Sequence, residues 1–81
     1  MRVEHHLKVH GKCPVDGALD AYDVVVRCNR VIKVEDILAA VESLTMEPIL
    51  QDQFTKQLAD ALKTEIETTG FHSGVQTRVI V

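Results

Sequence analysis

A thiol and a carboxylate lie seven residues apart in a short segment with strong turn signals, and together they could carry covalent chemistry. Cys13 and Asp20 flank Pro14 and Gly17, which favour a tight turn because proline presets one dihedral angle and glycine accepts positive φ. A thiolate is a strong nucleophile, and a nearby carboxyl group can transfer a proton to or from the attacked group. The alternative is a structural turn in which Cys13 is a small buried apolar residue.

Length and composition limit the kind of protein in which this segment lies. The chain has 81 residues, a net charge of -3 and 4% aromatic residues. We predict one domain over residues 1–81, with a core small enough that homo-oligomerisation is a natural source of stability. The negative charge and the few aromatic residues disfavour binding to a phosphate backbone or to stacked single strands.

The two cysteines, Cys13 and Cys28, do not form a disulfide scaffold. No segment has the apolar character of a signal peptide or of a membrane span. We therefore expect a reduced, cytoplasmic protein with no membrane partner. Cys28 ends a predicted strand on its apolar face, where we interpret it as a packing residue.

The elements that must position Cys13 and Asp20 are two strands. Apolar and polar residues alternate from about Val3 to His10, and Tyr22 to Arg27 is rich in β-branched residues. Turn signals occupy Gly11 to Leu19 between them. The pattern predicts two strands joined through the segment that carries the thiol.

Two helices are predicted after these strands. The first begins at Val34, and the second has Thr45 as its N-cap and Gly70 as its stop. The second helix has an apolar face with four-residue spacing, formed by Leu50, Phe54, Leu58, Leu62 and Ile66.

The chain closes with a strand from Val75 to Val81, or with a hairpin if Thr68 to His72 pairs with it through Ser73 and Gly74. The loop at residues 71–74 is either a ligand-contacting loop or a simple turn. The order strand, strand, helix, helix, strand or hairpin predicts an α+β fold, in which two helices cover one face of an antiparallel sheet.

This order and the turn resemble the tunnelling-fold (T-fold) superfamily, whose units assemble into barrels. The turn is most similar to that of the 7-cyano-7-deazaguanine (preQ0) nitrile reductases and their amidinotransferase-like relatives, which reads CPVTGQPD. This chain has CPVDGALD and shares Cys13, Pro14, Val15, Gly17 and Asp20. The resemblance implies that Cys13 attacks a nitrile carbon to form a thioimide and that Asp20 donates the proton.

Two segments of this chain differ from those of the reductases and limit what the resemblance implies. In those enzymes a His-Glu pair in an FHEDVT-like segment binds the base. Residues 50–55 of this chain read LQDQFT and lack the pair. Gln51 and Asp52 are then the residues that could bind the edge of a heterocycle. The reductases hold NADPH with an ESKSLK-like segment, and residues 32–37 here read IKVEDI. We therefore expect no cofactor, and any enzyme to be amidinotransferase-like rather than a reductase.

A weaker similarity to GTP cyclohydrolase I lies in residues 4–7 (EHHL) and 51–62 (QDQFTKQLADAL). That family has a zinc-ligating Cys before the first motif, where this chain has Val3, and a Glu in its last strand that is absent here. Both differences count against cyclohydrolase activity.

A zinc site and the activation of Cys13 are the last questions that the sequence raises. His5, His6, His10 and Cys13 are suitable zinc ligands by type, but His5 points away from the other two histidines on a strand, and we predict no metal site. A reactive Cys13 needs a cation or a helix N-terminus nearby. Lys12 points to the opposite side, and His10 is the nearer candidate.

The leading hypothesis is therefore a small T-fold-like protein that binds or modifies a purine- or deazapurine-like heterocycle through Cys13 and Asp20. Nucleic acid enters only as a substrate that carries a modified base. The alternative is a non-catalytic oligomeric binding or assembly module that keeps the fold without the active site.

Overall fold

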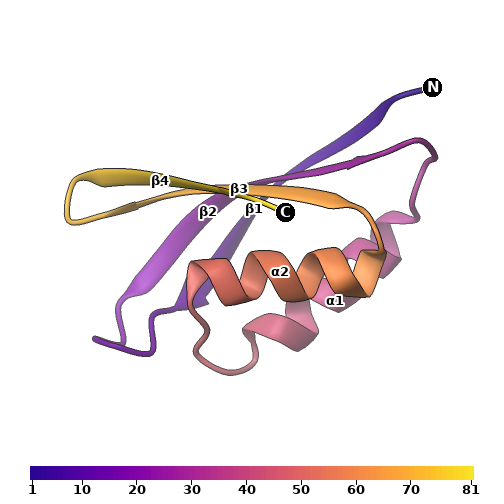
Figure 1. Ribbon diagram of the computed structural model, residues 1–81. Coiled ribbons are helices and arrows are strands. Elements are labelled where there is room, and N and C mark those ends of the chain that lie inside the picture. Colours follow the sequence, from indigo (N-terminus) through magenta and orange to yellow (C-terminus); the bar gives the residue numbers. More distant parts are fainter.

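The chain folds into four antiparallel strands with two helices on one face of the sheet, as Figure 1 shows for the computed structural model of residues 1–81. The elements are β1 (Val3–Lys12), β2 (Leu19–Cys28), α1 (Val34–Thr45), α2 (Gln51–Leu62), β3 (Glu65–His72) and β4 (Val75–Ile80). The strand order is β1-β2-β3-β4, with antiparallel pairing throughout. The predicted α+β layer is confirmed, and its closing element is the hairpin.

The register of the sheet decides which side chains face the helices. Tyr22 pairs with Val9 on β1 and with Gly70 on β3, and all three residues are buried. Because side chains alternate along a strand, every second residue of β2 joins the core. The core cluster on this face comprises Val9, Tyr22, Val24, Val26, Ile32, Ile37, Ile49, Phe54, Leu58, Ala59, Leu62 and Ile66.

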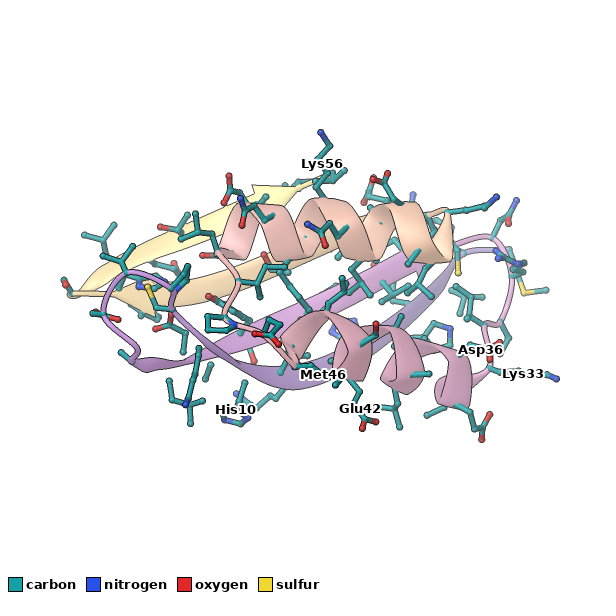
Figure 2. All side chains as sticks on the ribbon, turned by 90° about the horizontal axis from the view of Figure 1, so that it is seen from below. His10, Lys33, Asp36, Glu42, Met46 and Lys56 are labelled. Atoms are coloured by element: carbon teal, nitrogen blue, oxygen red, sulfur yellow. The ribbon has the colours of Figure 1, made fainter.

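Helix α2 provides most of the contact with the sheet. It buries six residues, whereas α1 buries Ile37 alone. The Phe54 ring stacks on Tyr22 with centroids 6.2 Å apart, which joins α2 to β2. Figure 2 shows both helices lying across the same face, with His10 and Lys56 labelled at opposite margins.

Two predicted helix boundaries are wrong. Thr45 is the last residue of α1, where its hydroxyl donates to the Val41 carbonyl at 2.9 Å, and the residue before α2 is Leu50. Helix α2 ends at Leu62 rather than continuing toward Gly70, because Lys63 adopts the left-handed conformation with φ of 56° and its N–H donates to Ala59. The chain can then enter β3 three residues after the helix.

Strands β1, β2 and β3 are longer than predicted, and β4 ends at Ile80 rather than Val81. β1 continues to Lys12 and β2 starts at Leu19, so the turn between them contains residues 13–18. β3 starts at Glu65 rather than Thr68. Because all neighbouring strands are antiparallel, the Cys13 turn and the β3–β4 turn lie at the same end of the sheet (Figure 1).

Gly70 allows the Tyr22 ring to lie flat over β3. A Cβ atom at this position would lie 2.6 Å from the ring, which is shorter than any real contact. A side chain at Gly70 would therefore displace Tyr22.

The opposite face of the sheet has no covering layer and is polar near its centre. Glu67 accepts hydrogen bonds from Arg27 at 2.8 Å and from Arg78 at 2.9 Å, and these guanidinium groups, Arg78 most of all, hold the pKa of Glu67 below its usual range. Cys28 packs against the core on the other face and donates to the Arg30 carbonyl. Neither helix is long and apolar enough to cross a membrane.

The two phenylalanines provide a matched test of this packing. Phe54 is fully buried in α2, and Phe71 is 63% exposed on β3. We expect Phe54→Ala to lower the free energy of unfolding by about 3–5 kcal/mol, because it leaves a cavity between α2 and the sheet. Phe71→Ala should change it by about 0.5 kcal/mol or less. Urea unfolding with unchanged slope measures both, and equal losses would contradict this packing.

Candidate functional site

The turn at residues 13–18 holds the Cys13 thiol in a fixed place at the end of β1. The Cys13 N–H donates to the Ala18 carbonyl at 2.9 Å, and the Gly17 N–H donates to the Cys13 carbonyl at 2.8 Å. Gly17 has φ of 72°, a conformation that glycine adopts without strain. Cys13 is 8% exposed, so the turn holds a largely buried thiol.

A pocket of about 470 Å³ opens beside this thiol. Three segments form it: the Cys13 turn, the start of α2 and the β3–β4 hairpin, which share one end of the molecule in Figure 1. Its lining residues are Cys13, Val15, Asp16, Leu50, Gln51, Asp52, His72, Thr77 and Val79. Three of the four predicted site residues, Cys13, Gln51 and Asp52, are thus brought together.

Asp20 is the fourth predicted site residue, and it does not line the pocket. It is 9% exposed, and its Oδ2 atom lies 3.4 Å from both the Tyr22 hydroxyl and His72 Nε2. The Tyr22 hydroxyl donates to this carboxylate. His72 lines the pocket, so Asp20 is connected to the pocket through the imidazole.

The side chain of Gln51 is used mainly for hydrogen bonds within the protein. Its Nε2 atom donates to the Thr68 hydroxyl at 3.1 Å and to the Thr77 carbonyl at 3.0 Å. The Thr55 hydroxyl accompanies it, lying 2.6 Å from that of Thr68 and donating to the Gln51 carbonyl. The amide nitrogen therefore ties α2 to β3 and β4, and the amide oxygen is the atom left for a ligand. Asp52 is exposed in the first turn of α2 and is free of such ties.

Electrostatic influences on the thiol oppose one another. The N-terminus of α2 has no side-chain cap, and its first N–H groups and helix dipole favour an anion in the pocket. The Asp16 carboxylate has the opposite effect. The Ala18 N–H donates to it at 2.9 Å and, together with the nearby Cys13 thiol, holds the pKa of Asp16 below its usual range, so Asp16 is a charged neighbour of Cys13.

His10, the nearer candidate in the sequence for a group beside Cys13, lies on the other face of the sheet. His10 pairs with Ala21 on the uncovered face of the sheet, whereas Gly11 and Asp20 face the helices. His72 occupies the pocket instead. The sequence gives the loop at residues 71–74 two interpretations, but it does not pair His72 with Asp20, because the two residues are 52 positions apart in the chain.

The histidines of β1 do not converge on the pocket. His6 bonds to Glu4 on the uncovered face, and His5 accepts from the Ile32 N–H on the other. No three His, Cys, Asp or Glu side chains are grouped as metal ligands. Cys13 and Cys28 are both free, and they lie toward opposite ends of the sheet because Cys28 pairs with Val3.

The fold and the pocket together define an α+β domain in which two helices cover one face of a four-stranded antiparallel sheet and a cysteine thiol lines the pocket at one end. In overall structure the chain is similar to a crystal structure of the archaeosine synthase QueF-Like in the apo form. The TM-score is 0.87, and the match covers 99% of this chain and 90% of that chain at 19% sequence identity. At that identity the likeness establishes the fold. The sequence matches no family profile and no curated protein.

Tyr22 offers a direct test of the geometry around Asp20. Burial raises the pKa of Tyr22 to about 12, and the adjacent Asp20 carboxylate adds to the rise. Because the folded state favours the neutral phenol, its contribution to stability is complete below pH 10 and is lost as pH rises from about 10 to 12. Tyr22 is the only tyrosine and there is no tryptophan, so phenolate absorbance reports it alone. Asp20→Asn should lower this pKa only in part, since burial is the larger cause. An unshifted titration near pH 10 in the folded protein would contradict the site.

Proposed function

We propose that this protein binds a purine- or deazapurine-like heterocycle in the pocket at the start of α2 and modifies it through Cys13. The observation that supports the proposal most is the placement of a largely buried thiol at a pocket, beside a helix N-terminus and one imidazole away from Asp20. These are the residue types that nucleophilic addition with proton transfer requires.

The proposed step is addition of the thiol to a nitrile. The sulfur of Cys13 bonds to the nitrile carbon, one π bond of the C≡N group breaks, and the nitrogen gains the proton that the thiol loses. Asp20 shuttles this proton from the sulfur to the nitrogen, and the product is a thioimide. Ammonia, as the co-reactant, then adds to the thioimide carbon and the C–S bond breaks. The products are an amidine and the free Cys13 thiol, so the reaction needs no hydride donor. The reaction class is therefore amidinotransferase-like, with no cofactor.

The heterocycle is supported by the acceptors at the pocket and by the structural neighbour. The amide oxygen of Gln51 and the carboxylate of Asp52 are acceptors at the start of α2, where they suit the ring N–H and amino donors of a guanine-like base. The similar fold belongs to a protein described as an archaeosine synthase. The substrate is either a free base or a modified base within nucleic acid, in the cytoplasm where the thiol stays reduced.

Assembly is part of the proposal. β1 and β4 are the edge strands of the sheet, with no further strand paired beyond either of them, and the pocket opens beside β4 through Thr77 and Val79. A second copy paired along these edges would cover the pocket and supply further contacts to the base. We expect light scattering at micromolar concentration to show a homo-oligomer. A strictly monomeric species would count against edge pairing.

A non-catalytic binding or assembly module is the second candidate. Two observations favour it: the Gln51 amide nitrogen is already satisfied, and Asp16 places a charged carboxylate beside the thiol. The rate of Cys13 alkylation near neutral pH separates the two candidates. A rate well above that of an ordinary thiol indicates the enzyme, and slow alkylation indicates the module.

The test of the proposed function is intact mass spectrometry after incubation with preQ0. We expect the mass to rise by one preQ0 per chain in the wild type and in Cys28→Ala, because Cys28 bonds to a carbonyl away from the pocket. Cys13→Ala should show no adduct. An adduct that persists in Cys13→Ala, or none in the wild type, would contradict the proposed chemistry.

A further inference from the structure

Three carboxylates and one imidazole lie at or next to the pocket that Cys13 lines. Asp16 and Asp52 line the pocket, and Asp20 lies behind it. Addition of the thiol to a nitrile needs a nearby group that can accept the thiol proton. His72 is the only basic side chain among the residues that line the pocket.

His72 connects the buried acid to the open pocket. It is the last residue of β3, and Ser73 and Gly74 follow it in a tight turn with φ of 50° and 81°. Its side chain is 41% exposed, whereas that of Asp20 is 10% exposed, and Nε2 lies 3.4 Å from Oδ2 of Asp20. An imidazole exchanges protons between about pH 5 and 8, and a carboxylate behind it orients the ring and stabilises the imidazolium.

We propose that His72 is a catalytic residue that carries the proton between Cys13 and the substrate, and that Asp20 acts through it rather than by contact with the substrate. This inference rests on the proposed function. Neutral His72 takes the thiol proton as the sulfur bonds to the nitrile carbon. The imidazolium, held by the Asp20 carboxylate, then gives that proton to the nitrile nitrogen. The proton count balances, and the pair returns to its starting state.

The pH dependence of the step belongs to His72 together with the groups that face it. These groups are Asp20 and Tyr22 from β2, Cys13 and Asp16 from the turn, and Asp52 from α2. Tyr22 stays neutral through the range in which the imidazole titrates, because burial raises its pKa to about 12. Tyr22 therefore contributes no inflection between about pH 5 and 8.

The experiment compares His72→Gln with His10→Gln. His10 is an exposed histidine on the uncovered face of the sheet and projects away from the helices at the β1 margin (Figure 2). The rate of preQ0 adduct formation is measured from pH 5 to 9 by intact mass, and the rate of Cys13 alkylation by iodoacetamide is measured over the same range. Circular dichroism confirms that both variants are folded.

We expect His72→Gln to slow adduct formation by about 100-fold or more and to remove the inflection between about pH 5 and 8. His10→Gln should behave as the wild type. Asp20→Asn should also slow the reaction, and the double variant with His72→Gln should be little slower than either alone, because the two residues act as a unit.

The outcomes separate this inference from the proposed function. If the wild type forms an adduct and His72→Gln matches it in rate and pH profile, the inference is overturned while the proposed function stands. If the wild type forms no adduct, the proposed function fails, and the iodoacetamide profile decides the role of His72. An inflection lost only in His72→Gln supports the coupling of His72 to the thiol, and identical profiles overturn it.

Discussion

The bonds made by the Gln51 carboxamide hold together the parts from which the site is built. One amide nitrogen reaches Thr68 on β3 and Thr77 on β4 from the first turn of α2, and the Thr55 and Thr68 hydroxyls complete the group. A buried polar side chain without partners costs free energy, so these groups fix α2 at one height over the hairpin. The Cys13 turn joins this arrangement because the Ile49 N–H donates to the Lys12 carbonyl. The pocket exists because these contacts fix the three segments relative to one another.

Much of the fold was predictable because its strands alternate regularly and its helices have one apolar face. The boundary between α2 and β3 was not, because Ile66 fits both patterns. It follows Leu62 at helical spacing, and it also alternates with its neighbours in β3. The residue that decides between them is Lys63, which ends the helix in a left-handed conformation that is typical of glycine rather than lysine. Sequence pattern alone carries no sign of that choice.

The candidate site, like the fold, was predictable from the sequence only in part. Local sequence places Cys13 in a turn and Gln51 and Asp52 at a helix start, and the structure brings all three to one pocket. Asp20 lies on the correct face of β2 but contacts the pocket only through His72. That pairing depends on the register between β2 and β3, which composition and periodicity do not specify. Asp16 stands where the resembling turn has Thr, but only the structure shows that the Ala18 N–H holds its carboxylate in the turn that carries Cys13.

The contact between Gly70 and Tyr22 has a consequence for how such a sequence can vary. The Tyr22 ring occupies the space above Gly70, and the Tyr22 hydroxyl donates to Asp20. A larger residue at position 70 would push the ring aside and move the donor away from the carboxylate. We therefore expect positions 22 and 70 to vary together in related sequences. Where position 70 carries a side chain, position 22 should carry a smaller residue than tyrosine. The lack of a side chain at Gly70 on β3 therefore keeps the Tyr22 hydroxyl where it can donate to Asp20 on β2.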